Sequence, residues 1–472
     1  MSSVRGLDEV KSQEFINAMI KIRSILYISI ALLLAGCTND DDTHPAVSAQ
    51  DANVITLGVK EVVSPVSRAQ HTGSMDFTQL KSTGFGVYGY KGEYSSSPTP
   101  TLFADNASNT HVTWVSGGTD PTTTLVHPGS WKYAETAANQ KEWVTTDKYT
   151  FFAYAPYMAD ASNSGPGITS VKTDVEAGDP TIGYTVAEDP AESVDLLWGV
   201  RTDTKEKSGL PWIDLQQGQT NSAVLFTFYH ALCAIGVHAQ VIVDQQNRLT
   251  DIDDESHLGT IGKADGCKVT LKSITITPAE TTSPVTAAVP LHKSGVLNLN
   301  NTTAHEPNWQ SKSTSDGISS LVLSGNQIDA DMKDPQLNDT PLTTEQITSF
   351  MNDASNPGVT ESANTQTVIA GDKLFMHIPQ EAQDYNLTVE YFLTYKTESG
   401  YHREKVSGTA KVKDLKLVAG VKYYLNLVFG LTTFKLNVTA TDWEGEILNK
   451  SVVIETGTSA SSSLAKQTSI TE

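Results

Sequence analysis

Apolar and polar residues alternate along most of the chain with the period of β-strands. In residues 434–441 every second residue is apolar, namely Phe434, Leu436, Val438 and Ala440, and the residues between them are polar. A period of two is typical of strands that bury one face in an antiparallel sheet. Runs of this kind, bounded by Gly, Pro, Asn, Asp and Ser, predict strands at 54–63, 84–90, 111–115, 149–156, 194–199, 223–243, 268–277, 286–291, 319–324, 373–378, 386–396, 405–413, 421–429, 432–441 and 446–454.

One segment, residues 343–354, has the spacing of a helix. Ile347, Phe350 and Met351 fall on one face there, and the two threonines at its start can supply the N-cap. With so little helix between the strands, a parallel α/β architecture is disfavoured. The pattern therefore predicts an all-β protein with two antiparallel β-sandwich domains in series.

An acidic loop that contains glycine, residues 244–266, separates two groups of predicted strands and marks the expected domain boundary. We place the N-terminal domain at 69–245 and the C-terminal domain at 246–456. Residues 457–472 are rich in Ser and Thr, a composition typical of a flexible tail.

The first residues carry the features of a bacterial export signal. Basic residues precede an apolar run, residues 25–34, that is too short to span a bilayer comfortably. The sequence LAGC at 34–37 resembles a lipobox, in which cleavage before the cysteine is followed by attachment of a lipid to it. We expect residues 1–36 to be a signal peptide with Met19 as the biological start, and Cys37 to be lipidated.

Charge and cysteine content narrow the classes of partner. The formal net charge of −21 over 472 residues repels phosphate backbones, so nucleic acid is not expected as a partner. The acidic run TNDDD at 38–42 resembles a surface-export signal and fits a solvated tether equally well. Three cysteines cannot build a disulfide framework. Cys233 and Cys267 would lie far apart in a hairpin closed by the 244–266 loop, and we expect both to be buried free thiols.

The chain lacks the common catalytic motifs. It has no G-x-S-x-G, H-E-x-x-H, C-x-x-C or phosphate-binding glycine loop. The acidic run from Asp251 to Glu255 lacks the glycine and the final carboxylate of an EF-hand loop, which favours a solvated surface loop over a calcium site. A carboxylate pair for glycoside hydrolysis leaves no mark in sequence spacing, and nothing singles one out. We therefore expect no enzyme, no metal and no cofactor.

His230 and the tryptophans receive ordinary structural interpretations. His230 lies in an apolar stretch, which favours a core histidine with satisfied hydrogen bonds over a ligand or a base. Tryptophans can stack on sugars, but most tryptophans in proteins belong to the core or to an interface. The tryptophans considered are Trp131, Trp143, Trp198, Trp212 and Trp443.

The segment before residue 69 has the composition of a removable leader. Ile55, Leu57 and Val59 alternate as in a strand, although their surroundings are polar. Apart from Lys60, Arg68 is the only basic residue between Cys37 and Lys81. An apolar strand followed by an exposed basic residue favours cleavage between Arg68 and Ala69, while the alternative is a strand that stays in the first domain.

The order of several short motifs resembles the fimbrillin-like family of Bacteroides-type bacteria, which comprises type V pilins and their accessory subunits. The resemblance extends over about residues 50–445. The motifs are FGVYGY at 85–90, W-x-Y at 131–133, YTFFAYAPY at 149–157, DLLWG at 195–199, FTFYHALCAIGVHAQV at 226–241, VTLKSITIT at 269–277, HIPQ at 377–380, and GVKYYLNLVFGL with DW at 420–443.

This resemblance implies two tandem transthyretin-like β-sandwich domains and export as a lipoprotein to the cell surface. A trypsin-like protease would cut after Arg68 and remove the lipidated leader, residues 37–68, with its strand. A strand from the next subunit would then fill the vacated groove. The core-facing residues of the removed strand would be Ile55, Leu57, Val59 and Val63, and those of a candidate donor strand near the C-terminus Leu448, Val452 and Ile454.

The resemblance further implies a structural subunit of a cell-surface fimbria that serves adhesion or biofilm formation. Its partners would be other fimbrial subunits in a homo- or hetero-polymer, the outer membrane through a lipid anchor before processing, and host or bacterial surface ligands. The alternative from a different class is a non-polymerising, surface-anchored lipoprotein that binds glycan or protein ligands, with tryptophans as stacking platforms. Accessory anchor subunits keep their leader, so the sequence leaves the position in a fibre open.

Overall fold

The structure is a computed structural model. It describes residues 54–63, 75–95, 109–119, 126–127, 129–133, 141–159, 163–172, 179–219, 223–241, 268–282, 285–313, 317–325, 328, 342–352, 367–369, 374–397, 400–429, 434–442, 447–448 and 453–455. The chain divides into two units, residues 1–52 with 116–130 and residues 53–115 with 131–472. In the first unit, β4 (Gly118–Thr119) pairs with β5 (Val126–His127). All other elements described below belong wholly or mainly to the second unit.

The first sheet contains eight strands in the order β1-β12-β10-β7-β2-β3-β6, with β11 paired to β7. The sequence YTFFAYA of β7 is almost continuously apolar, and every residue of this strand is buried, so that it buries side chains on both faces of the sheet. The strands are β1 (Thr56–Val62), β2 (Phe85–Lys91), β3 (Thr110–Val115), β6 (Ser130–Tyr133), β7 (Tyr149–Ala155), β10 (Leu197–Val200), β11 (Trp212–Leu215) and β12 (Ala223–His230).

A four-stranded sheet in the order β18-β17-β9-β8 packs against one face of the first sheet through a shared hydrophobic cluster. Its strands are β8 (Gly167–Val171), β9 (Thr181–Thr185), β17 (Ser294–Asn298) and β18 (Asn308–Ser313). β17 pairs with β9 although it follows the expected boundary at 245/246 in sequence. The division into two tandem domains at that point stays a prediction.

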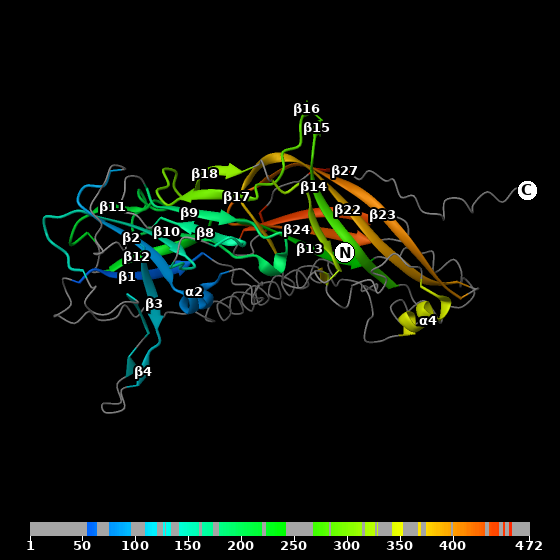
Figure 1. Ribbon diagram of the computed structural model, residues 1–472, viewed down its shortest axis with the longest axis horizontal. Helices are drawn as coiled ribbons and strands as arrows, with labels where there is room; N and C mark the ends of the chain where they lie inside the picture. The colour runs from blue at the N-terminus through cyan, green and yellow to red at the C-terminus, as the bar shows by residue number, and fades with distance from the viewer. Residues whose placement is uncertain are drawn as a thin grey trace, which may run out of the picture. The chain divides into compact units, whose positions relative to one another are not determined.

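Two further sheets complete the described strands. One has the order β20-β13-β24-β25-β26 with β21 paired to β13, and the other has the order β19-β14-β22-β23-β27. Figure 1 shows β22 and β23 as two long neighbouring strands. The strands are β13 (Cys233–Val241), β14 (Lys268–Ala279), β19 (Leu321–Ser324), β20 (Thr367–Ile369), β21 (Phe375–His377), β22 (Gln380–Thr397), β23 (Gly400–Leu417), β24 (Val421–Phe429), β25 (Phe434–Asp442), β26 (Ile447–Leu448) and β27 (Val453–Glu455).

These sheets confirm the predicted all-β class. One predicted strand is wrong, because residues 223–243 form two strands in different sheets: β12 ends at His230 in the first sheet and β13 starts at Cys233 in another. The predicted hairpin between the strands that carry Cys233 and Cys267 is also wrong. β13 pairs with β20, β21 and β24, whereas β14 pairs with β19 and β22.

Two hydrophobic clusters fill the interior. The larger cluster joins one face of the first sheet, including Phe152 and Trp198, to the other large sheets. The smaller cluster lies on the opposite face of the first sheet and includes Ile55, Leu57 and Phe226. β1 therefore contributes to only one of the two clusters.

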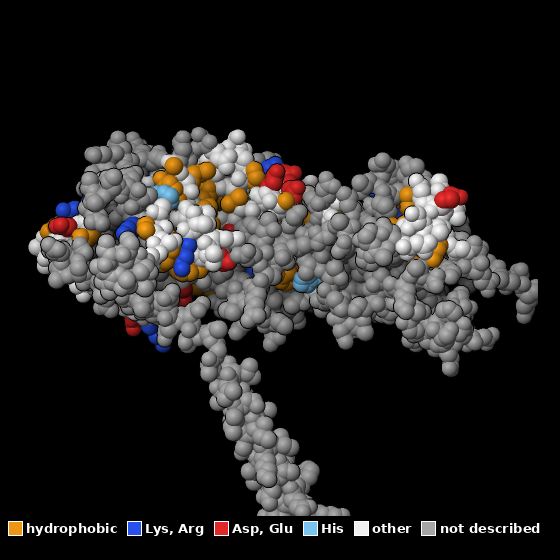
Figure 2. Space-filling model, turned by 90° about the horizontal axis from the view of Figure 1, so that it is seen from below, with side chains coloured by type: hydrophobic (Ala, Val, Ile, Leu, Met, Phe, Trp, Pro, Cys, Tyr) orange, Lys and Arg blue, Asp and Glu red, His pale blue; other side chains and the backbone are white. Residues whose placement is uncertain are grey.

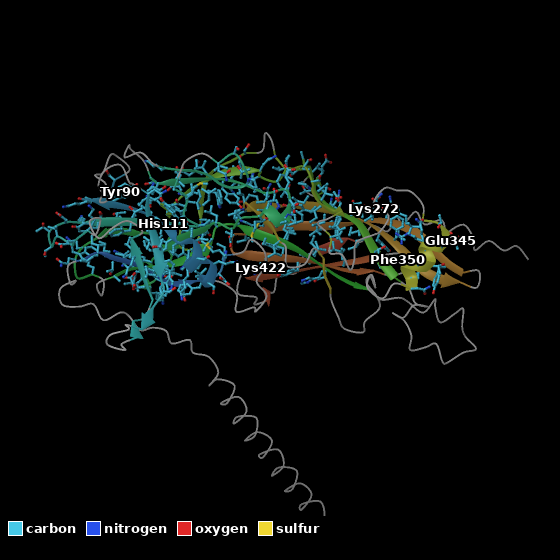
Figure 3. The ribbon with its side chains drawn as sticks, turned by 60° about the horizontal axis from the view of Figure 1, so that its bottom comes forward. Tyr90, His111, Lys272, Glu345, Phe350 and Lys422 are labelled. Atoms are coloured by element: carbon cyan, nitrogen blue, oxygen red, sulfur yellow. The ribbon has the colours of Figure 1, made fainter. Side chains whose placement is uncertain are left out.

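Two α-helices lie among the described residues. α4 (Thr344–Asn352) confirms the predicted helix, and it buries Phe350 and Met351. Glu345 and Phe350 both come from α4 (Figure 3), and the Arg403 guanidinium of β23 lies 5.5 Å from the Phe350 ring. The other helix, α2 (Phe77–Thr83), begins with a capping box between Asp76 and Gln79, as the sequence D-F-T-Q permits.

Short elements of the described chain lie outside the large sheets. A 3₁₀ turn spans Pro190–Glu192, and β15 (Thr281–Thr282) pairs with β16 (Val285–Thr286). The predicted strand at 286–291 is wrong beyond Thr286, because no strand continues there.

Hydrophobic and charged side chains of both signs are interspersed on the described part of the face in Figure 2. Among the described residues no helix has the length and apolar character needed to cross a membrane.

Candidate functional site: the edge strand β1 and its groove

β1 lies at the edge of the first sheet and runs parallel to β12. Leu57 is opposite Val224, and Val59 is opposite Phe226. The register then shifts by one residue at Lys60, so that Glu61 is opposite Thr227. A one-residue bulge of this kind moves the following side chains to the other face of the sheet.

The buried face of β1 supplies apolar side chains to the smaller hydrophobic cluster. Ile55 is 0% exposed and Leu57 is 5% exposed. Val59 and Val62 are half-buried and pack against the same cluster. Because of the bulge, Val62 takes the core-facing position that uninterrupted alternation gives to Glu61. Val63, the predicted core-facing residue, is half-buried beyond the end of the strand.

Backbone contacts fix both ends of β1. Near its start, the Ile55 N–H donates to the Lys141 carbonyl at 2.7 Å. Past its end, the Val63 N–H donates to the Phe228 carbonyl of β12 at 2.9 Å. The strand is thus held along its whole described length.

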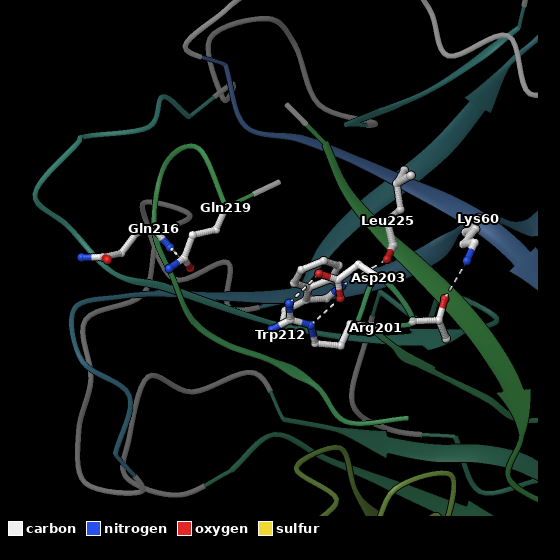
Figure 4. Close-up of polar contacts among 8 residues, drawn as sticks. Lys60, Arg201, Asp203, Trp212, Gln216, Gln219 and Leu225 are labelled. Carbon is white, nitrogen blue, oxygen red and sulfur yellow. Dashed lines mark hydrogen bonds and ion pairs between the residues drawn. The ribbon is translucent and has the colours of Figure 1, made fainter. Parts of the chain in front are cut away.

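Polar contacts join β1 to the segment that follows β10 (Figure 4). The Lys60 Nζ of β1 donates to Thr202 Oγ1 at 3.2 Å. The Arg201 guanidinium lies 4.2 Å from the Trp212 ring and donates two hydrogen bonds to Asp203, at 2.7 and 2.6 Å. Arg201 therefore fixes the segment that follows β10, the strand that pairs with β12 on the side opposite β1.

The residues on either side of segment 64–74 are attached to β12 and its neighbour. Val63 contacts Phe228, as described above. Met75 donates its backbone N–H to Asp195 Oδ2 at 2.9 Å, and the same oxygen lies 2.7 Å from His230 Nδ1. His230 is 3% exposed, which confirms the predicted core position. The role of Asp195 and the start of α2 were missed by sequence analysis; the capping sequence D-F-T-Q was the available signal for the helix.

The remaining predicted site residues divide into two groups. Cys37, Arg68, Ala69 and Val452 lie outside the described residues. Leu448 lies in β26 opposite Ala440 of β25, and Ile454 lies in β27 opposite Val412 of β23. The C-terminal segment is thus shared between the edges of two sheets of its own chain.

Three of the tryptophans considered in the sequence, and Cys233, are buried. Trp143, Trp198 and Trp212 are buried, which confirms a core role, while Trp131 is half-buried and Trp443 lies outside the described residues. The Cys233 thiol is free and buried, donates to the His377 carbonyl at 3.3 Å, and has its pKa raised by burial to about 12. Cys267 lies outside the described residues. No cluster of three or more metal-ligating side chains occurs among the described residues.

A family model described as fimbrillin-like matches residues 68–443, which is most of the chain. The chain belongs to the fimbrillin-like family. The match begins at Arg68, so β1 lies before the matched region.

Two relatives illustrate how far this fimbrillin-like chain resembles known proteins. Fimbrium subunit Fim1C of Phocaeicola vulgatus is 25% identical over 225 residues, which cover 46% of this chain and 50% of that protein. The match thus spans about half the length of this relative. A crystal structure of a fimbrial protein from Bacteroides vulgatus superposes with a TM-score of 0.52 at 18% identity and covers 83% of this chain and 99% of the other. The superposition supports the fold.

Proposed function

We propose that this fimbrillin-like chain is a subunit of a cell-surface fimbria and assembles by removal of its leader and exchange of β1 for a strand of a neighbouring subunit. The observation that carries the proposal is the position of β1. It is an edge strand that buries Ile55 and Leu57 in the core. The sequence joins it to the next described residue, Met75, through a segment that contains Arg68.

The energetics favour replacement over an empty groove. Fully burying an Ile or Leu side chain contributes about 1.5–3 kcal/mol. Removal of β1 exposes the cluster that Ile55 and Leu57 cover and leaves the β12 backbone groups unpaired. A strand that restores both contacts binds by β-augmentation, so assembly needs no other energy source.

The proposal includes anchoring and location. Lipidation of Cys37 would hold the precursor at the outer membrane with its folded part exposed at the cell surface. Cleavage between Arg68 and Ala69 would separate the folded part from the lipid, and the subunit would join other subunits in a fibre. Adhesion or biofilm formation is then the role proposed for the fibre, towards host or bacterial surface ligands.

Substitution of Arg68 tests the cleavage step. We expect wild-type surface material to begin at Ala69 by N-terminal sequencing and to form polymers that resist dilution. The Arg68→Ala variant should keep the lipidated leader and stay monomeric. Lys60→Ala is the matched control, because it removes the other basic residue of the leader without removing the proposed site. Polymers from Arg68→Ala protein would contradict the proposal.

A second candidate function is supported by an aromatic cluster on α2, β3 and β6. The Lys81 Nζ lies 4.5 Å from the Phe77 ring and 4.3 Å from the Trp114 ring, and Trp114 contacts Trp131 with ring centroids 5.4 Å apart. Lys81 occupies one face of the Phe77 and Trp114 rings, and the half-buried rings of this cluster offer apolar surface on which a sugar can stack. A surface-anchored, glycan-binding lipoprotein would carry acylated Cys37 on all of its surface material, which the same sequencing experiment detects.

A further inference from the structure

The register of β1 in its groove depends on a glycine. Gly58 is opposite Leu225 of β12 and is buried. A Cβ atom at this position would lie 3.0 Å from Leu225 Cδ2 and 3.8 Å from Trp131 Cδ1. One methyl group requires Leu225 to move slightly, but a branched side chain would place further carbon atoms between Leu225 and Trp131. The groove therefore discriminates by size at this position.

Two strands inside the sheets repeat the sequence pattern of β1 and show what the glycine does. The pattern apolar-x-apolar-Gly-apolar of residues 55–59 occurs again at 196–200 and 233–237, as well as at 417–421 and 427–431. A Cβ atom on Gly199 would lie 2.9 Å from Ala153 Cβ, and one on Gly236 would lie 2.8 Å from Leu374 Cδ2. In each case a side chain from a neighbouring segment occupies the space that a Cβ atom of the glycine would need. Glycine weakens a strand interior, and close approach by a neighbour is the physical reason to use it there.

The bulge adds a second feature to the groove. The shift at Lys60 leaves one residue without a partner on β12 before pairing resumes at Glu61. Lys60 is exposed and reaches Thr202, so the extra residue is accommodated on the solvent side. The groove thus selects a parallel strand with apolar residues at the positions of Ile55, Leu57 and Val59, and with glycine at position 58.

We propose that the strand that replaces β1 enters parallel to β12 with a glycine opposite Leu225, and that it comes from a different subunit of the fibre, one that carries the pattern apolar-x-apolar-Gly-apolar. This inference rests on the proposed function. The chain's own candidate donor strand, residues 447–455, does not fit, since it contains no glycine and the glycines on either side of it, Gly445 and Gly457, follow Glu444 and Thr456. In the parallel register these polar residues would take the place of Leu57, which is 5% exposed, without a polar partner.

Peptide exchange tests the proposal without altering the folded protein. The chain is cleaved after Arg68, and fluorescein-labelled peptides are added in excess to compete with the retained leader, with binding followed by anisotropy. The peptide with residues 53–63 should bind, and its Gly58→Val variant should bind at least about 30-fold more weakly. Glu61→Val is the matched control, because Glu61 is exposed, and its affinity should stay within threefold of the parent peptide.

Direction and partner are tested in the same assay. A peptide with the sequence of residues 53–63 reversed should bind at least tenfold more weakly than the parent, and a peptide with residues 447–457 should not displace the leader. Equal binding of the Gly58→Val peptide, of the reversed peptide or of the 447–457 peptide overturns the selective groove and leaves strand exchange intact. Failure of the parent peptide itself overturns both this inference and the strand-exchange step of the proposed function.

Discussion

His230 Nδ1 lies 2.7 Å from Asp195 Oδ2, and the same carboxylate oxygen accepts the backbone N–H of Met75. His230 is the last residue of β12, and Asp195 lies just before β10. Met75 is the first described residue after segment 64–74. The buried Asp195 carboxylate therefore connects Met75, which would remain in the protein after cleavage, to β12, the strand that pairs with β1.

Loss of this carboxylate should destabilise the protein strongly. Asp195→Asn replaces the carboxylate that contacts His230 Nδ1 and the Met75 N–H with an amide of nearly the same shape. Hydrogen bonds to a charged group contribute about 1.5–3 kcal/mol each. We expect a loss of about 2–3 kcal/mol in the free energy of unfolding, measured with urea. The exposed Glu192→Gln serves as the control and should change little; a loss under about 1 kcal/mol for Asp195→Asn would show that the contact is dispensable.

Truncation of Leu57 should destabilise the precursor and have no effect after strand exchange. Leu57 is 5% exposed, and a Leu→Ala change in a core costs about 2–5 kcal/mol. The Leu57→Ala precursor should therefore unfold at lower denaturant, whereas Lys60→Ala should change little because Lys60 is exposed. In polymers that have lost the leader, all three proteins should unfold alike. A Leu57→Ala defect that persists in the polymer would mean that β1 stays in place.

His377 should make stability fall in mild acid. Burial lowers the pKa of His377 from 6.5 to about 4, and neither ring nitrogen has a hydrogen-bond partner among the described residues. Between these values the unfolded chain binds a proton that the folded chain does not. The contribution of neutral His377 to the free energy of unfolding is therefore complete above pH 6.5, and it declines by about 3 kcal/mol as the pH falls to 4.

The His377→Leu variant isolates this effect. The pKa values of His111, His238 and His292 are also lowered by burial, so they contribute with the same sign. The informative quantity is the difference between wild type and variant in unfolding free energy from pH 7 to pH 4. The variant should have the flatter profile. Parallel profiles would exclude His377 as a source of the acid sensitivity.

Arg201 should not tolerate replacement by lysine. It is 6% exposed, stacks on Trp212 and binds both oxygens of Asp203. Lysine cannot reproduce the two-pronged hydrogen bond or the planar stacking. Arg201→Lys should lower the unfolding free energy by about 1–3 kcal/mol, measured by thermal or urea unfolding. Lys207→Arg at an exposed position is the control and should leave the unfolding free energy unchanged. An unchanged unfolding free energy for Arg201→Lys would contradict the packing of Arg201 against Trp212 and Asp203.

Local patterns in the sequence predicted the strands well and their partners poorly. Alternation in β1 correctly places Ile55 and Leu57 in the core. The bulge at Lys60 depends on pairing with β12, and the sequence of the strand itself does not predict it. The run from 223 to 243 likewise reads as one strand, because its side chains are buried before and after the change of sheet. The contact between Asp195 and Met75 joins residues 120 positions apart, a separation that local periodicity does not sample.

The parallel pairing of β1 with β12 bears on how a fibre would carry tension. β12 continues through Ala231 and Leu232 into β13, so its C-terminal end is tied to another sheet of the same subunit. A parallel incoming strand that belongs to the C-terminal side of its own subunit is pulled at its N-terminal end. The two strands are then loaded from opposite ends and slide along each other, so that all of their hydrogen bonds resist together rather than opening one after another.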